Sequence, residues 1–398
     1  MADIPLYPLY GTSYHLYRVS PLYHGESPLL SERGLRTHAR RLRDLLKGDN
    51  VRGVEVDFAP TADAMPNLGP LEECNWNLVG DEDAWIDRHR QVLDPDSSQV
   101  SEVVSPDRAR GIEVEVGYER SAYSALLLRD PANTTSPDGF TALPLLLVKM
   151  PALIREVFLN YLKTAFDAHI SPLRLPSTFL TSTLESYFHH LGAPTSTQKI
   201  QDVIRKLHIQ LAFPQTTDLL KHIDITIAGT DVPGFLAQGK LIPNSSQIPF
   251  TAALSKYLQK HLALDLSNPK VYISRIHCGA FTLAIDRLKI IAPETQSEVS
   301  LSEASSAPEA SASQLAVQEL YSSLVCEASG TGKFLPESMA GEPRSSTPSS
   351  TGSGRHGQRK RAVSTTAGAS ATTKRPRGRP KAVNGGREAQ TEEDMGDA

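Results

Sequence analysis

The sequence predicts an α+β protein whose strands are mostly antiparallel, followed by a long disordered C-terminal tail. Short segments with strand periodicity recur through the first 292 residues, and segments with helical spacing separate some of them. Many consecutive strand candidates have no helix between them, which favours antiparallel pairing. Composition then changes near Ala292, where Ser, Thr, Ala, Gly and Pro begin to dominate.

The N-terminal part of this body is rich in strand candidates around one helix. Apolar residues at helical spacing predict a helix over residues 31–47, with Gly48 as its C-terminal stop. The segment from Ile112 alternates strictly between apolar and acidic residues, which is typical of a half-buried strand. Strands are expected near residues 14–22, 51–58, 71–79, 112–118 and 123–128.

Helices become more prominent in the second part of the body. Pro151 suits the first turn of a helix that extends to Phe166, and Gly192 closes a second helix that begins at Ser177. A third helix is expected near residues 250–264. Strands are expected over residues 203–213, 223–228, 271–276, 280–285 and 288–291.

Domain boundaries follow from these patterns. Residues 1–135 are predicted to be the strand-rich N-terminal part of one body, and residues 136–292 its C-terminal part. From residue 293 to 398 only Tyr321 and Phe334 are aromatic, so burial cannot offset the entropy lost on ordering, and the segment is predicted to be disordered. A short helix over residues 312–325 is the one exception that we expect.

Composition excludes several classes of protein. The formal net charge of −4 argues against a surface covered with phosphate-binding groups, and the three cysteines are too few and too dispersed for a disulfide framework. No apolar run is long enough to span a bilayer and the first residues lack the features of a signal peptide, so we expect a soluble protein of a reducing intracellular compartment.

Motifs that carry enzymatic chemistry are weak in this chain, and we predict a non-enzymatic protein without a cofactor or metal. The sequence GTGK at residues 330–333 lacks the first glycine and the final Ser or Thr of a phosphate-binding loop. The acids Asp81, Glu82 and Asp83 are interpreted as a solvated polar loop. Neighbouring side chains diverge on helices and strands, so His189 with His190, and His277 with Cys278, are not expected to share a metal ion.

The helix over residues 31–47 carries an excess of positive charge. Its basic face is open to two interpretations: contact with DNA phosphates, or the solvated side of an amphipathic helix that packs through its leucines. The residues concerned are Arg36, Arg40, Arg41 and Arg43.

One segment of the tail has a specific nucleic-acid signature. Arg377, Gly378 and Arg379 form the Arg-Gly-Arg core of an AT-hook, in which the glycine lets the backbone lie in a narrow A·T minor groove and the guanidiniums enter its negative potential. The complete predicted DNA-binding set is Lys374, Arg375, Arg377, Gly378, Arg379, Pro380 and Lys381. Basic residues Arg359, Lys360 and Arg361 would suffice, with Lys374 and Arg375, as a nuclear localisation signal, which is the competing interpretation.

Several stretches of the body together resemble a known family. These are LYGTSYHLYRVSPLYH at 9–24, residues 35–53, LEECNW at 71–76, GDEDAW at 80–85, GFTALPLLLVKMP at 139–151, HLALDL at 261–266 and IHCGAF at 276–281. They resemble the fungal counterpart of centromere protein L (CENP-L), over nearly all of residues 6–291. The resemblance implies a non-enzymatic subunit of the inner kinetochore, in the Sim4-type complex, in the nucleus at centromeres. It also implies pairing with a CENP-N counterpart, and a link between CENP-A chromatin and the outer kinetochore. The fold that it implies is α+β, with a curved, mostly antiparallel mixed sheet flanked by helices.

The last strands of the body are the predicted contact with that partner, because an unpaired strand edge can accept a partner strand. The side chains concerned are Val271, Ile273, Ile276, Phe281, Leu283 and Ile285. The main alternative is an AT-hook chromatin or transcription factor whose body binds another protein. An uncharacterised enzyme is a third possibility, without a supporting group of residues.

Overall fold

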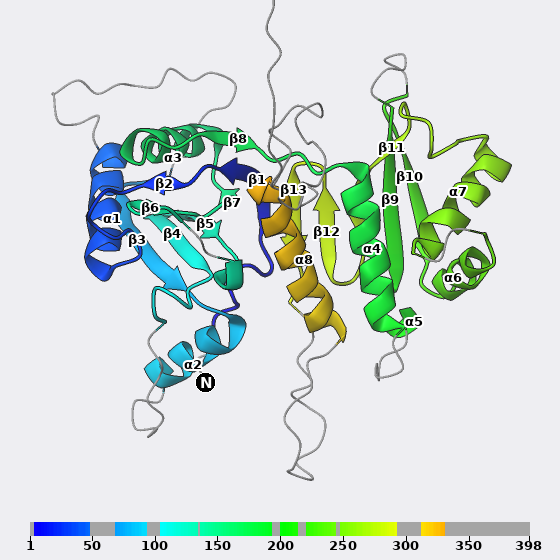
Figure 1. The fold of residues 1–398 in the computed structure, drawn as a ribbon, viewed down its shortest axis with the longest axis horizontal. Coiled ribbons are helices and arrows are strands. Elements are labelled where there is room, and N and C mark those ends of the chain that lie inside the picture. Colours follow the sequence, from blue (N-terminus) through cyan, green and yellow to red (C-terminus); the bar gives the residue numbers. More distant parts are fainter. Residues whose placement is uncertain are drawn as a thin grey trace, which may run out of the picture. The chain divides into compact units, whose positions relative to one another are not determined.

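A long antiparallel sheet organises the computed structural model (Figure 1), which describes residues 4–47, 68–93, 104–133, 136–192, 200–213, 220–243, 247–292 and 312–330. Its strands follow the order β10-β9-β11-β12-β13-β1-β7-β5-β4-β3, and β8 also pairs with β1. The strands are β1 Ser13–Val19, β3 Leu71–Val79, β4 Gly111–Tyr118, β5 Ser121–Leu128, β7 Leu145–Lys149, β8 Ile170–Pro172, β9 Lys206–Ala212, β10 His222–Ala228, β11 Tyr272–His277, β12 Phe281–Ala284 and β13 Arg287–Ile290. The short strands β2 Leu22–Tyr23 and β6 Phe140–Thr141 form a separate pair.

Helices cover the sheet on both faces. Helices α1 and α3 pack on one face, and α4 and α8 contact each other and strands of the other face. The helices are α1 Glu32–Lys47, α2 Glu82–Leu93, α3 Ala152–Ala165, α4 Ser177–Leu191, α5 Ile200–Val203, α6 Val232–Lys240, α7 Pro249–Leu262 and α8 Ala312–Ser329, with a 3-10 turn at Pro131–Asn133.

The central strands divide the core into two clusters. On β7, Leu145 and Leu147 belong to the cluster shared with α4 and α8, whereas Leu146 and Val148 belong to the cluster under α1 and α3. Successive side chains on a strand point to opposite faces, so a strand covered on both sides is apolar without alternation. Each of these four side chains is at most 1% exposed.

The predicted fold class is confirmed, and most predicted elements are present. The helix α4 and the strand β3 have the predicted bounds, and α1, α3 and α7 differ from theirs by a residue or two. The predicted strand over residues 51–58 and the stop at Gly48 lie outside the described residues. The acids at residues 81–83 are not a loop: Glu82 and Asp83 form the first turn of α2, and the Asp81 carboxylate accepts a hydrogen bond from the Ala84 amide at 2.9 Å.

The folded body extends beyond the predicted boundary after residue 292. The short helix expected at 312–325 exists as α8 and is longer, and it contributes Leu320, Tyr321 and Leu324 to the core. The Tyr321 hydroxyl donates a hydrogen bond to the carbonyl of Arg129, and the Arg18 guanidinium donates one to the Glu327 carbonyl at 2.8 Å. The helix is therefore part of the body. The rest of the predicted tail, residues 331–398, lies outside the described residues.

Candidate protein-interaction surfaces

The predicted partner edge is not an edge in the structure. Strand β11 lies between β9 and β12, and β12 lies between β11 and β13. The side chains of Val271, Ile273, Ile276, Phe281 and Leu283 are at most 9% exposed, and Ile285 is partly buried. The alternating apolar residues that suggested a partner surface face the protein's own core instead.

Within the described part of the chain, the sheet ends at β3 on one side and at β10 on the other. The two ends differ in accessibility. The Arg43 guanidinium of α1 donates a hydrogen bond to the Glu72 carbonyl of β3 at 2.7 Å, and the register of β3 shifts between Leu71 and Glu73. Bulges and covering groups protect an edge from further pairing. By contrast, β10 pairs with β9 over seven consecutive residues without a shift.

Helices α6 and α7 follow β10 in the chain and pack against each other (Figure 1), and four exposed apolar residues belong to them or to the loop between them. We call them the α6–α7 surface: Leu241, Ile248, Tyr257 and Leu262, which are 84%, 44%, 47% and 49% exposed. The two helices approach closely at Gly239, a buried residue at the end of α6. A Cβ atom on Gly239 would lie 1.7 Å from the Pro249 carbonyl oxygen, so only glycine permits this approach.

A buried carboxylate fixes the start of α7 against α4. Glu185 of α4 is 7% exposed and accepts hydrogen bonds from the amides of Phe250 and Thr251, at 3.3 and 2.6 Å. Burial raises the pKa of Glu185, and the amide hydrogen bonds oppose that rise. The α6–α7 surface is thus carried by a rigidly attached element.

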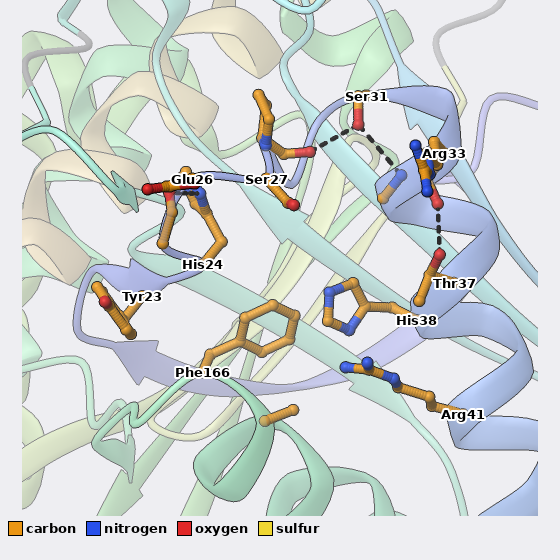
Figure 2. Close-up of a pocket in the computed structure, with 14 residues that line it drawn as sticks. Tyr23, His24, Glu26, Ser27, Ser31, Arg33, Thr37, His38, Arg41 and Phe166 are labelled. Carbon is orange, nitrogen blue, oxygen red and sulfur yellow. Dashed lines mark hydrogen bonds between the residues drawn. The ribbon is translucent and has the colours of Figure 1, made fainter.

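A second surface is a pocket of about 640 Å³ beside the basic helix α1 (Figure 2). Its walls come from α1, from the loop between β2 and α1, and from Ala165 and Phe166 at the end of α3. The polar residues that line it are Tyr23, His24, Glu26, Ser27, Ser31, Arg33, Thr37, His38 and Arg41. Sequence reasoning missed this pocket because its walls are more than a hundred residues apart in the chain.

The ring of His38 forms part of the pocket's floor. It lies 4.5 Å from the Phe166 ring and 5.8 Å from the Trp76 ring, between centroids, and its Nδ1 is 2.8 Å from the Tyr161 hydroxyl. Burial, with the nearby charge of Arg41, lowers the pKa of His38 to about 4. The imidazole is therefore neutral at pH 7.

The four predicted basic residues of α1 have different surroundings. Arg36 forms an ion pair with Glu32, Arg43 binds the β3 carbonyl, and Arg41 lines the pocket. Arg40 is exposed. The leucines Leu35 and Leu42 are buried, so α1 is an amphipathic helix whose basic side faces outward. This geometry is compatible with both interpretations of the basic face.

The histidine pairs make ordinary contacts. His190 pairs with Glu319 of α8 at 2.6 Å, and His277 Nδ1 lies 2.7 Å from the Thr282 hydroxyl. Cys74 and Cys278 are buried free thiols, and Cys326 is an exposed one. Among the residues described, no three His, Cys, Asp or Glu side chains gather as metal ligands. Within the same ranges, none of the helices has the length and apolarity to cross a membrane.

The predicted DNA-binding residues 374–381, the basic residues 359–361 and most of the GTGK segment lie outside the described residues.

A comparison with family models decides the family. The model described as Centromere protein L matches residues 8–329, from just before β1 to the end of α8. The chain belongs to the centromere protein L family. The match includes α8, in agreement with the packing of that helix on the core. A search of curated proteins found no match.

Membership of the centromere protein L family identifies the chain as a component of the centromere and kinetochore, in the nucleus. This is a family of structural kinetochore components rather than known enzymes. The relevant features of the fold are therefore surfaces for other macromolecules.

Proposed function

We propose that this CENP-L family member pairs with a CENP-N-like subunit in the inner kinetochore, in a Sim4-type complex, and helps to link CENP-A chromatin to the kinetochore. The observation that carries the proposal is that β10, among the described strands, pairs only with β9, and that the helices α6 and α7 that follow it carry the exposed apolar α6–α7 surface. A free strand edge supplies backbone donors and acceptors, and nearby apolar side chains supply contact area.

The side chains of β10 suit this role. His222, Asp224 and Thr226 are exposed on one face, and Ile223 and Ile225 are only partly buried on the other. A partner strand added beside β10 would bury the two isoleucines further and continue the antiparallel sheet. Residues 222–228 thus replace residues 271–285 as the proposed partner edge.

The first test is co-purification of the full chain with its CENP-N counterpart. Leu241→Asp combined with Leu262→Asp should weaken pairing at least about tenfold, because charges would be buried in an apolar contact. In the complex, amides of residues 222–228 should exchange hydrogen for deuterium more slowly than in the free chain.

The matched control is Leu45→Asp combined with Val157→Asp, on α1 and α3. These side chains are also exposed apolar residues, at 54% and 37%, and lie on other helices. Pairing should be retained in this variant. A folded Leu241→Asp, Leu262→Asp protein that pairs normally would exclude the α6–α7 surface, whereas absence of any complex with the unmodified chain would exclude the partner.

We further propose that residues 374–381 act as an A·T-preferring DNA tether and that residues 359–361 contribute to nuclear import. The support is the Arg377-Gly378-Arg379 core with flanking prolines in the sequence. A tether raises the local concentration of the hook near chromatin that the complex already holds, so a weak contact prolongs residence.

A further inference from the structure

The pocket beside α1 is lined by two arginines, Arg33 and Arg41, and by one carboxylate, Glu26, so its lining carries a net positive charge. Arg33, Thr37 and Arg41 are spaced by four residues, so they form one stripe along the helix and all line the pocket (Figure 2). Neither Arg33 nor Arg41 forms an ion pair with any carboxylate in the described ranges. The neighbouring Arg36, outside the pocket, is paired with Glu32.

The pocket combines this charge with an apolar floor. The ring of Phe166, which is 1% exposed, lies beside the neutral, half-buried ring of His38 (Figure 2), and Pro28 also lines the pocket. Ser31 caps the first turn of α1, since its hydroxyl accepts a hydrogen bond from the Gly34 amide at 3.1 Å and donates one to the Pro28 carbonyl at 2.7 Å. The charged donors that line the pocket are the guanidinium groups of Arg33 and Arg41.

The spacing of the two arginines indicates an extended occupant. Eight residues of helix rise about 12 Å, whereas an extended peptide covers about 3.3 Å per residue. A segment of about four extended residues thus spans the distance between the two helix positions. Guanidinium groups bind carboxylates and phosphates through paired hydrogen bonds.

A DNA duplex fits this hollow less well than a peptide does. The phosphates of a duplex lie on its convex outer surface. That surface would contact side chains on the outer side of α1, such as Arg36 and Arg40, rather than enter the pocket. Those two arginines do not line the pocket. A volume of about 640 Å³ instead accommodates a few residues of a peptide chain.

We propose that this pocket binds an extended, anionic segment of a partner protein, with Arg33 and Arg41 contacting its acidic or phosphorylated side chains and the half-buried His38 ring packing against its backbone. This surface is separate from the β10 edge, so the inference stands whether or not the pairing proposal is correct.

The test is fluorescence anisotropy with the full chain and three labelled Gly/Ser peptides. They carry two phosphoserines, two glutamates or two serines at the same positions, four residues apart, so that both side chains lie on one face of an extended chain about 13 Å apart. Arg33→Glu combined with Arg41→Glu should weaken binding of the charged peptides at least about tenfold at ~0.15 M salt, where distant charges are screened. The serine peptide should not bind.

The matched control is Arg36→Glu combined with Arg40→Glu, which makes the same change in net charge on the same helix outside the pocket. It should alter peptide binding less than about threefold, because Arg36 and Arg40 do not line the pocket and their charges are screened at this salt concentration. Preference between the phosphoserine and glutamate peptides identifies the natural anion. The proposal is overturned if neither charged peptide binds the unmodified chain with a Kd below about 1 mM, or if both variants weaken the peptides and a duplex DNA probe equally.

Discussion

Glu113 is a buried carboxyl group on β4 with few compensating contacts. It is 6% exposed, and no hydrogen bond or ion pair joins it to another residue in the described part of the chain. Burial raises the pKa of Glu113 to about 7, and the neighbouring Glu115 carboxylate adds to that rise. The folded protein therefore binds a proton more tightly at this position than the unfolded chain does.

The sign of the pH effect follows from this difference. Between the unfolded pKa of about 4.5 and the folded pKa of about 7, the native state holds more protons, so the free energy of unfolding falls as pH rises. Glu113→Gln should be more stable than the unmodified chain at pH 8, by up to roughly 3 kcal/mol. Below pH 5, the free energies of unfolding of Glu113→Gln and of the unmodified chain should become similar. Urea unfolding at pH 5, 6, 7 and 8 measures this.

Glu119→Gln, in the turn after β4, is the control for the loss of a carboxylate. Glu119 is exposed, so its replacement should change stability at pH 8 by less than about 1 kcal/mol. Equal stability of Glu113→Gln and the unmodified chain at pH 8 would show that Glu113 is well solvated when ionised.

At the scale of the element, α8 is a helix whose stability comes from docking. Arg110 lies 5.0 Å from the centre of the Tyr321 ring and donates a hydrogen bond to Gln318 at 2.9 Å. Leu320 and Leu324 are 2% and 1% exposed, whereas Leu315 on the same helix is 47% exposed. An isolated helix of this length is marginal in water, so the buried leucines hold it in place.

Leu324→Ala should lower the free energy of unfolding by about 2 to 5 kcal/mol, as for other buried leucines. Leu315→Ala should change it by less than about 1 kcal/mol, because the site is half exposed and the helical propensity of alanine is high. Urea unfolding of both variants compares the two sites. If the two substitutions had equal effects, α8 would not be an integral part of the folded body.

Sequence periodicity found most helices but not the central strand β7. Its five residues, LLLVK, are almost uniformly apolar because both faces are covered, so the strand lacks the alternation that identified β4. The flanking Pro144 and Pro151 were the available signal for a short buried strand. Helix α2 was missed because Asp81, Glu82 and Asp83 read as a polar loop, although acids are favourable in a first helical turn.

The prediction of the partner edge was wrong for a different physical reason. Alternating apolar residues show that one face of a strand is buried, and they say nothing about which strands are its neighbours. The pairing that covers the outer side of β11 is with β9, and it joins residues about 60 positions apart in the chain. For the same reason, no local pattern announced the pocket that α1 forms with Phe166.

On the scale of the whole molecule, the family match ends at residue 329, and the basic segment of the sequence lies beyond it. The nine Lys and Arg between Arg355 and Lys381 have no acid among them, while acids predominate on both sides. General attraction to phosphates depends on charge alone, whereas preference for A·T duplexes requires side chains that enter the minor groove. Two variants of the tail with equal charge can therefore separate the two effects.

Arg377→Ala combined with Arg379→Ala should abolish the preference of the full chain for A·T-rich over G·C-rich duplexes, which we expect to be about tenfold. Lys360→Ala combined with Arg361→Ala removes the same charge and should weaken both duplexes equally, leaving the ratio unchanged. Fluorescence anisotropy with the two duplexes measures the ratio, and circular dichroism should show the body unaltered. Equal affinity of the unmodified chain for both duplexes would reduce residues 374–381 to an import signal with general phosphate attraction.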